Sequence, residues 1–170
     1  MNIIFLDIDG VLNSMPYFLY LKKNHIDEEY NQINDYNLQM LSKIYHACNA
    51  KIVLSSSWRT LNDPKDKESY KLYESLLRKL NDYDMEIFSQ TPVINNNRPL
   101  EIYTWLSERS DKENINFVII DDDFNKEDYE EYDLSDNLVQ TQFYCDDIKL
   151  AGLTKKLTDA AISILKRNYK

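Results

Sequence analysis

Residues 3–13 read Ile-Ile-Phe-Leu-Asp-Ile-Asp-Gly-Val-Leu-Asn, an apolar run that ends in two carboxylates and a glycine. The run predicts a buried strand over residues 2–8, followed by a turn at Gly10. Ligands of open α/β sheets bind at the carboxyl ends of the strands, where this pattern places Asp7 and Asp9. Two neighbouring acids repel each other, so their presence there indicates a bound cation or a shared proton.

A calcium-binding loop of the D-x-D-x-D-G type is the alternative interpretation of these acids. Counted from Asp7, the fifth, sixth and twelfth positions hold Val11, Leu12 and Phe18. An EF-hand requires an oxygen ligand, a glycine and a glutamate at these positions. The segment therefore does not fit a calcium loop.

Length and composition are those of an ordinary globular protein. With 170 residues, of which 43% are hydrophobic and 29% charged, the sequence predicts a single domain over residues 1–170 with a substantial core. The formal net charge is −9 and the pI is about 4.7. Since broad nucleic-acid-binding faces are usually basic, we expect no extensive face of that kind. A small site for a nucleic-acid end is compatible with this charge.

The cysteines and histidines indicate neither a disulfide framework nor a zinc site. Cys48 and Cys145 lack a C-x-x-C pattern, and His25 and His46 are isolated from each other. The first residues lack the pattern of a signal peptide, and no stretch approaches the ~18 apolar residues of a membrane span. We therefore expect a protein of the reducing cytoplasm that does not associate with membranes.

Strand and helix patterns alternate along the rest of the chain. Short apolar runs predict further strands at 51–55, 85–88, 115–120 and 138–141. Apolar residues at helical spacing predict helices at 36–48, 67–80, 100–108 and 153–167. Residues 15–34 are expected to form a short helix and a loop over the site, and the acidic segment 121–136 a solvated loop or frayed helix. The alternation predicts a three-layer α/β fold with a parallel, Rossmann-like sheet.

Polar side chains follow three of the predicted strands. Asp7 and Asp9 follow the first, Ser55-Ser56-Ser57-Trp58-Arg59 follow the second, and Asp121-Asp122 follow the strand at 115–120. Because parallel strands end at the same edge of a sheet, these three sets are expected to lie together.

Their chemistry fits a phosphate group and a divalent cation. Small hydroxyl residues and free backbone N–H groups at a strand-to-helix turn suit a phosphoryl oxygen. A ligand set made only of oxygens favours Mg²⁺. Arg98 stands just before a predicted helix and adds a positive charge that can serve the same site.

In these features the chain resembles the haloacid dehalogenase (HAD) superfamily of phosphotransferases. The matching motifs are Asp7-Ile8-Asp9-Gly10-Val11, Ile52-Val53-Leu54-Ser55, Arg98 and Val118-Ile119-Ile120-Asp121-Asp122. The Ser-Ser-Ser-Trp-Arg segment, Arg98 with Glu101, and Gly152-Leu153-Thr154 are most similar to the HAD domain of Swiss Army Knife RNA-repair proteins. The gaps between the motifs are short, so the resemblance implies a HAD-like fold with no cap or a minimal one.

The resemblance implies a role for each motif residue. Asp7 is the nucleophile that forms an aspartyl-phosphate, and Asp9 is the general acid and base. Mg²⁺ is held by the Asp7 carboxylate, the Asp9 carbonyl and Asp122. Ser55 holds a phosphoryl oxygen and Arg98 stabilises the developing negative charge.

Several of these assignments have alternatives. Ser56 fits the second motif as well as Ser55, and Asp121 is the alternative metal ligand to Asp122. The family more often has lysine at the third motif, and Arg59 competes with Arg98 for that role. Substrate contacts are implied at Gly10, Ser56 and Arg59, with a surface ion pair as the other interpretation of Arg59. Trp58 is interpreted as a packed side chain, with stacking on an aromatic leaving group as the alternative.

The resulting hypothesis is a Mg²⁺-dependent phosphatase that uses an aspartyl-phosphate intermediate. The open site indicated by the short gaps suits a bulky or polymeric phosphate, such as a nucleic-acid end or a phosphoprotein. A nucleotide or another phosphorylated small molecule is the alternative substrate. Two alternatives are a HAD-fold binding or regulatory protein with weak turnover and a phosphotransferase to an acceptor other than water. All four motif positions are filled, which favours an enzyme.

Overall fold

A five-stranded parallel sheet forms the centre of the molecule. The computed structural model describes residues 1–28, 31–110 and 114–167. The sheet order is β3-β2-β1-β4-β5, and all four pairings are parallel. The strands are β1 (Asn2–Leu6), β2 (Ala50–Leu54), β3 (Ile87–Gln90), β4 (Asn116–Asp121) and β5 (Leu138–Gln140). β1 is central and apolar throughout its last four residues, as expected of a parallel strand covered on both faces.

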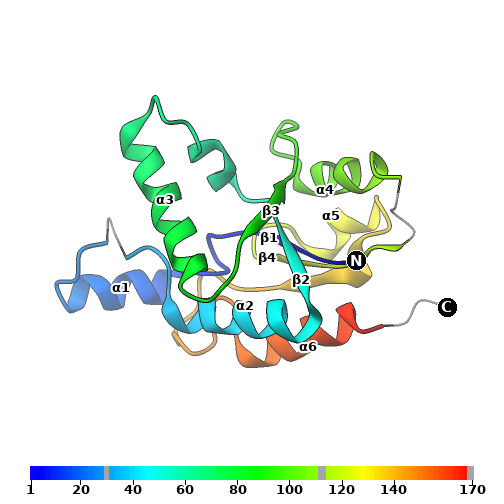
Figure 1. Cartoon of the computed structure of the whole chain (residues 1–170). Coiled ribbons are helices and arrows are strands. Elements are labelled where there is room, and N and C mark those ends of the chain that lie inside the picture. The colour runs from blue at the N-terminus through cyan, green and yellow to red at the C-terminus, as the bar shows by residue number, and fades with distance from the viewer. Residues whose placement is uncertain (29–30, 111–113, 168–170) are drawn as a thin grey trace.

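Helices cover both faces of this sheet (Figure 1). They are α1 (Met15–Lys23), α2 (Asp35–Cys48), α3 (Lys67–Asn81), α4 (Arg98–Ser107), α5 (Lys126–Glu130) and α6 (Lys155–Leu165), with short 3₁₀ helices η1 (Ser57–Leu61) and η3 (Ser135–Asn137). Successive side chains of β1 point to opposite faces. Ile4 and Leu6 pack in the cluster that includes α2, α3 and α6, whereas Ile3 and Phe5 pack in the cluster that includes α4 and α5. The predicted three-layer α/β fold is confirmed.

The strand order places β1 at the point where the chain reverses its direction across the sheet. From β1 the chain proceeds outward through β2 and β3, and it later returns to the other side of β1 with β4 and β5. Such a topological switch point opens a crevice at the carboxyl ends of the strands. Asp7 directly follows β1 and therefore lies at this crevice.

The third strand begins later than predicted. Residues 85–88 were the expected strand, but β3 runs from Ile87 to Gln90. The backbone N–H of Met85 donates to the carbonyl of Leu80 at the end of α3 (3.1 Å), and Asp84 has φ of 54°. Met85 is thus part of the turn that ends α3, and its apolar side chain packs in the core from that turn.

The acidic segment 121–136 is better ordered than a solvated loop. Asn125 and Asp128 form a reciprocal capping box that begins α5. Tyr129 on this helix is fully buried, and its hydroxyl donates to Asp121. A local cap and one buried aromatic residue therefore stabilise a short helix within a segment that was predicted to be a solvated loop or a frayed helix.

The remaining elements agree with the predictions to within a few residues at their ends. α4 begins at Arg98 instead of after it, because the Asn97 side chain accepts the N–H of Leu100 and caps the helix there. Between β1 and β2 the chain forms α1 and α2, and between β2 and β3 it forms η1 and α3. Neither gap contains a second sheet within the described ranges, in agreement with a minimal cap. No helix in those ranges has both the length and the apolar character needed to cross a membrane.

Candidate active site

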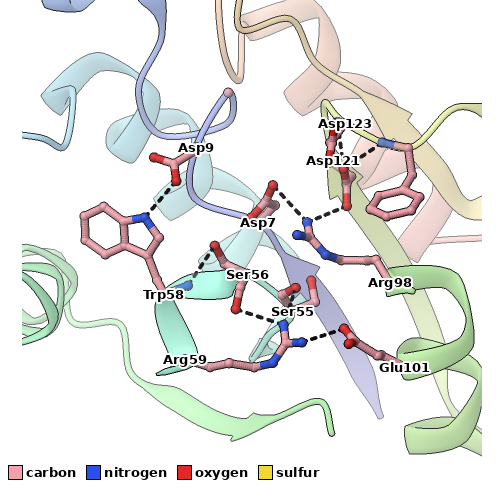
Figure 2. Close-up of polar contacts among 12 residues, drawn as sticks. Asp7, Asp9, Ser55, Ser56, Trp58, Arg59, Arg98, Glu101, Asp121 and Asp123 are labelled. Carbon is pink, nitrogen blue, oxygen red and sulfur yellow. Dashed lines mark hydrogen bonds and ion pairs between the residues drawn. The ribbon is translucent and has the colours of Figure 1, made fainter. Parts of the chain in front are cut away.

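Asp7 and Arg98 form the centre of the site (Figure 2). Asp7 is 4% exposed, and its backbone N–H donates to the carbonyl of Ile120 on β4, which continues the pairing of the two strands. Arg98 Nη1 lies 2.8 Å from Asp7 Oδ2 and 2.8 Å from Asp121 Oδ2. One guanidinium from the first turn of α4 therefore bridges the carboxylates that end β1 and β4.

Asp121 is fully engaged by protein groups. Its Oδ1 accepts the backbone N–H groups of Asp123 (2.9 Å) and Phe124 (3.2 Å). Its Oδ2 accepts the hydroxyl of Tyr129 at 3.1 Å in addition to Arg98. These four contacts fix Asp121 and leave Asp122 as the acid of this pair that lines the pocket.

The acids can supply a cation site. Asp7, Asp121 and Asp122 each offer one carboxylate oxygen, and these three atoms lie within 4.8 Å of one another. An all-oxygen set of this kind suits Mg²⁺. Because four contacts already engage Asp121, Asp7 and Asp122 are the better donors.

Burial and mutual repulsion change the ionisation of two of these acids. Burial raises the pKa of Asp7 to about 6, although the charge of Arg98 opposes the shift. Burial also raises the pKa of Asp122 to about 7, and the charges of Asp7, Asp121 and Asp123 add to the effect. A divalent cation would relieve this repulsion, which supports a metal at the same place.

The pKa shifts predict that the metal-free protein loses stability as the pH rises from about 4 to about 7. Over this range folded Asp7 and Asp122 retain protons that the unfolded chain has released, so the folded state becomes relatively less favourable at higher pH. We expect a lower melting temperature at about pH 8 than at about pH 5 in EDTA, and Mg²⁺ should offset the loss at the higher pH.

Asp122→Asn is the control for this prediction, because it removes the most strongly shifted of these groups. The variant should show a weaker dependence of its melting temperature on pH. An equal or higher melting temperature of the metal-free wild type at the higher pH would contradict the assigned shifts.

Asp9 is held by two neutral donors. Its Oδ2 accepts the indole N–H of Trp58 (2.9 Å), and its Oδ1 accepts the side-chain amide of Asn13 (2.8 Å). Asn13 in turn accepts the backbone N–H of Gly10 at 3.0 Å. Trp58 is 6% exposed, so it is packed as expected, and its polar edge also orients an acid of the site.

Gly10 makes room for Asp122. Its φ is +71°, a left-handed conformation that favours glycine, and a Cβ atom there would lie 2.0 Å from Asp122 Cγ. The contribution of Gly10 in this structure is therefore its lack of a side chain beside the acid pair.

The three serines after β2 occupy different places. The hydroxyl of Ser56 accepts the backbone N–H of Trp58 at 3.4 Å, and Ser56 lies close enough to Asp7 to oppose the rise in the pKa of that carboxyl. Ser57 lines the pocket that contains Asp7. The buried hydroxyl of Ser55 has no hydrogen-bond partner among the residues described. The choice between Ser55 and Ser56 for the second motif stays a prediction.

Arg59 forms a buried ion pair away from the pocket. Its Nη2 lies 2.6 Å from Glu101 Oε2, and its Nη1 donates to the carbonyls of Ser55 and Ser56 at 2.8 Å each. From the sequence Arg59 was predicted to contact substrate, with a surface ion pair as the alternative. The structure shows a buried ion pair, because Glu101 of α4 faces the turn after β2, and Arg59 does not line the pocket. Arg98 is the arginine that contacts Asp7. Arg59 instead binds the carbonyls of the serine turn, on the side away from the pocket (Figure 2).

A pocket of about 270 Å³ brings these groups together. Its lining consists of Asp7, Asp9, Ser57, Arg98, Asp122, Asp123, Phe143 and Tyr144. Ser57, Asp123 and both aromatic residues were not predicted from the sequence to line the pocket. Phe143 and Tyr144 follow β5, and an aromatic pair just after a strand that ends at the same edge was the available signal.

Comparison with known proteins identifies one relationship. The family model described as "HAD domain in Swiss Army Knife RNA repair proteins" matches residues 3–146. No curated protein and no solved structure matches the chain. The matched span contains each acid, serine and arginine of the site described above.

Proposed function

The chain belongs to the family of HAD domains found in Swiss Army Knife RNA repair proteins, and we propose that it is a Mg²⁺-dependent phosphatase that forms an aspartyl-phosphate. Membership of this family supports a hydrolase of the phosphatase type. The observation that carries the proposal is the position of Asp7, which ends the central strand beside Arg98, Asp122 and Ser56. In this proposal one pocket would combine a nucleophile, the acids that can hold a cation and a turn that can bind phosphate.

In the first half-reaction, a carboxylate oxygen of Asp7 attacks phosphorus, and the bond from phosphorus to the leaving oxygen breaks. Asp9 donates a proton to that oxygen. Arg98, 2.8 Å from Asp7, stabilises the negative charge on the transferring group. Ser56 and the amides of its turn hold a phosphoryl oxygen.

In the second half-reaction, water attacks the phosphorus of the aspartyl-phosphate and its proton passes to Asp9. The bond between phosphorus and Asp7 breaks, so inorganic phosphate leaves and Asp7 is restored. The two donors on Asp9 keep its carboxylate facing the pocket through both steps.

Asp7 and Asp122 would hold Mg²⁺ together with the Asp9 carbonyl. The bound ion supplies charge neutralisation for the phosphoryl group. Asp121 fixes Arg98 and supports the site through contacts that are already complete.

For substrate we propose a phosphorylated small molecule, a nucleotide or a nucleic-acid end. The net charge of −9 disfavours long polyanions that need an extensive basic face. We also propose a cytoplasmic location and keep the single domain over residues 1–170 as a prediction.

The proposal is tested by phosphate release with Mg²⁺ and with EDTA. The panel contains a chromogenic phosphate, nucleotides, oligonucleotides phosphorylated at either end and a phosphopeptide. Release that requires Mg²⁺ supports the proposal. A folded protein that binds Mg²⁺ yet releases no phosphate from any member of the panel would overturn it.

Trp58→Phe should lower kcat/KM by about tenfold for an alkyl phosphate, because it removes one of the two donors that position Asp9. An alkoxide leaving group needs a proton from Asp9, whereas nitrophenolate leaves without one. We therefore expect a clearly smaller loss for nitrophenyl phosphate. The measurement is the ratio of the two kcat/KM values, because kcat also contains the hydrolysis of the aspartyl-phosphate, which is the same for both substrates.

Trp105→Phe is the matched control. Trp105 is 7% exposed and its indole also makes one hydrogen bond, to Ser89 Oγ at 3.1 Å. Its replacement should leave the ratio between the two substrates as in the wild type. An equal loss on both substrates in Trp58→Phe would show that Trp58 acts only through packing.

A further inference from the structure

An aromatic wall separates the candidate catalytic pocket from a second pocket. Phe143 and Tyr144 line the pocket that contains Asp7 and Asp9, and they also line an adjoining pocket of about 420 Å³. The remaining lining of the second pocket is Asp122, Gln140, Thr141 and Gln142. A ligand bound at Asp7 can therefore extend across the two aromatic residues.

The wall is fixed to the body of the protein. The carbonyl of Phe143 accepts the backbone N–H of Met15 at the start of α1 (3.0 Å), and the Phe143 ring lies 6.2 Å from that of Phe18. On the other side, the N–H of Thr141 donates to the carbonyl of Asp121 at 2.9 Å. Phe143 is thus a supported ring directly beside the candidate catalytic acids.

The ring of Tyr144 packs against Phe143 and is exposed to solvent. Its side chain is 75% exposed, and its ring centre lies 4.8 Å from that of Phe143 with the two planes at 79°. An exposed aromatic face at the mouth of a polar pocket can stack on a planar ring of a ligand. Trp58, the stacking candidate from the sequence, is buried and donates to Asp9, so it does not offer a free face.

The charges around the wall restrict the ligand further. Acidic residues Asp122 and Asp123 line the pockets, and Asp146 and Asp147 are exposed just beyond Tyr144. Among the described residues, Arg98 is the only basic side chain that lines either pocket. The site thus offers positive charge for one phosphate, and an uncharged ring is the part of a ligand that the wall favours.

We infer that Phe143 and Tyr144 form a nucleoside subsite, in which the base of a nucleoside monophosphate stacks on Tyr144 while its phosphate lies at Asp7. The inference rests on the proposed phosphatase function for the position of the phosphate. It goes further by assigning the base to a particular ring and by favouring a single terminal phosphate.

Two probes that differ only in the base test this subsite: adenosine monophosphate and ribose phosphate. Tyr144→Ala should reduce kcat/KM for adenosine monophosphate about tenfold more than for ribose phosphate, chiefly through KM. Tyr144→Phe retains the ring and should restore the selectivity of the wild type. Tyr103→Ala is the control, because Tyr103 is 46% exposed on α4 but lies outside both pocket linings.

A binding measurement separates this inference from the phosphatase proposal. With Asp7→Asn protein and Mg²⁺, calorimetry should show adenosine monophosphate binding about tenfold more tightly than ribose phosphate, and Tyr144→Ala should remove the difference. Equal affinity for the two probes, or equal losses on both in Tyr144→Ala, would overturn the subsite. Absence of phosphate release by the wild type, together with Tyr144-dependent binding, would overturn the phosphatase proposal alone.

Discussion

Asp7→Asn is expected to lower the rate of phosphate release by at least about 10³-fold, because an amide is a poor nucleophile at phosphorus. Asp7 is the carboxylate at the end of the central strand, 2.8 Å from Arg98. Asp121, the other acid that contacts Arg98, is already engaged by four protein donors. The measurement is phosphate release with Mg²⁺ under single-turnover and steady-state conditions.

The variant should remain folded, because asparagine has nearly the same shape and Asp121 still pairs with Arg98. A far-ultraviolet circular dichroism spectrum like that of the wild type is the control. Release at the wild-type rate from folded Asp7→Asn protein would exclude Asp7 as the nucleophile. A phosphotransferase would show faster loss of substrate when an alcohol acceptor is added, with less inorganic phosphate formed.

The central part of the fold could be predicted because local pattern and burial agree there. β1 and β4 each contain an apolar run of four residues, and such runs are typical of strands buried on both faces of a parallel sheet. α3 follows its apolar spacing closely, since its exposed and buried positions alternate with helical period. In these elements no tertiary contact opposes the local preference.

Elements at the periphery could not be predicted as well because tertiary contacts decide them. Met85 is apolar and precedes a strand, but its backbone closes the end of α3, so β3 starts at Ile87. Tyr129 is surrounded by acids in the sequence, yet it is fully buried and hydrogen-bonded to Asp121. In both cases the side chain is buried against distant parts of the chain, which the local pattern does not show.

The difference between local pattern and tertiary contact also decides which parts of the candidate active site could be predicted. Parallel topology alone brings Asp7 and Asp122 to one edge, and the sequence therefore indicated a cation site there. The donor set of Asp9 depends on the direction of one indole N–H, and the partner of Arg59 is a residue of α4 that lies 42 positions away in the sequence. Side-chain direction at turns is determined by packing, which periodicity does not describe.

Glu101→Gln is expected to destabilise the folded protein by about 3–5 kcal/mol, because it leaves the buried Arg59 guanidinium without its counter-charge. Glu101 is 1% exposed, accepts Arg59 Nη2 at 2.6 Å, and accepts the backbone N–H of Ile94 at 2.8 Å. The neutral amide of glutamine has only one acceptor oxygen, so it cannot accept both of these hydrogen bonds. For a chain of this length the loss corresponds to a fall in melting temperature of roughly 10 °C, measured by calorimetry.

Asp35→Asn makes the same acid-to-amide change in an exposed ion pair and serves as the control. Asp35 Oδ1 lies 2.6 Å from Lys79 Nζ, which is similar to the distance in the buried pair, but the Asp35 side chain is 69% exposed. Solvent screening makes such a pair nearly neutral for stability, so the melting temperature should hardly change. Similarly small changes in melting temperature in both variants would show that the Arg59–Glu101 ion pair contributes little to stability. A large loss of stability in Glu101→Gln alone would show that the Arg59–Glu101 pair holds the serine turn against α4, on the side away from the pocket.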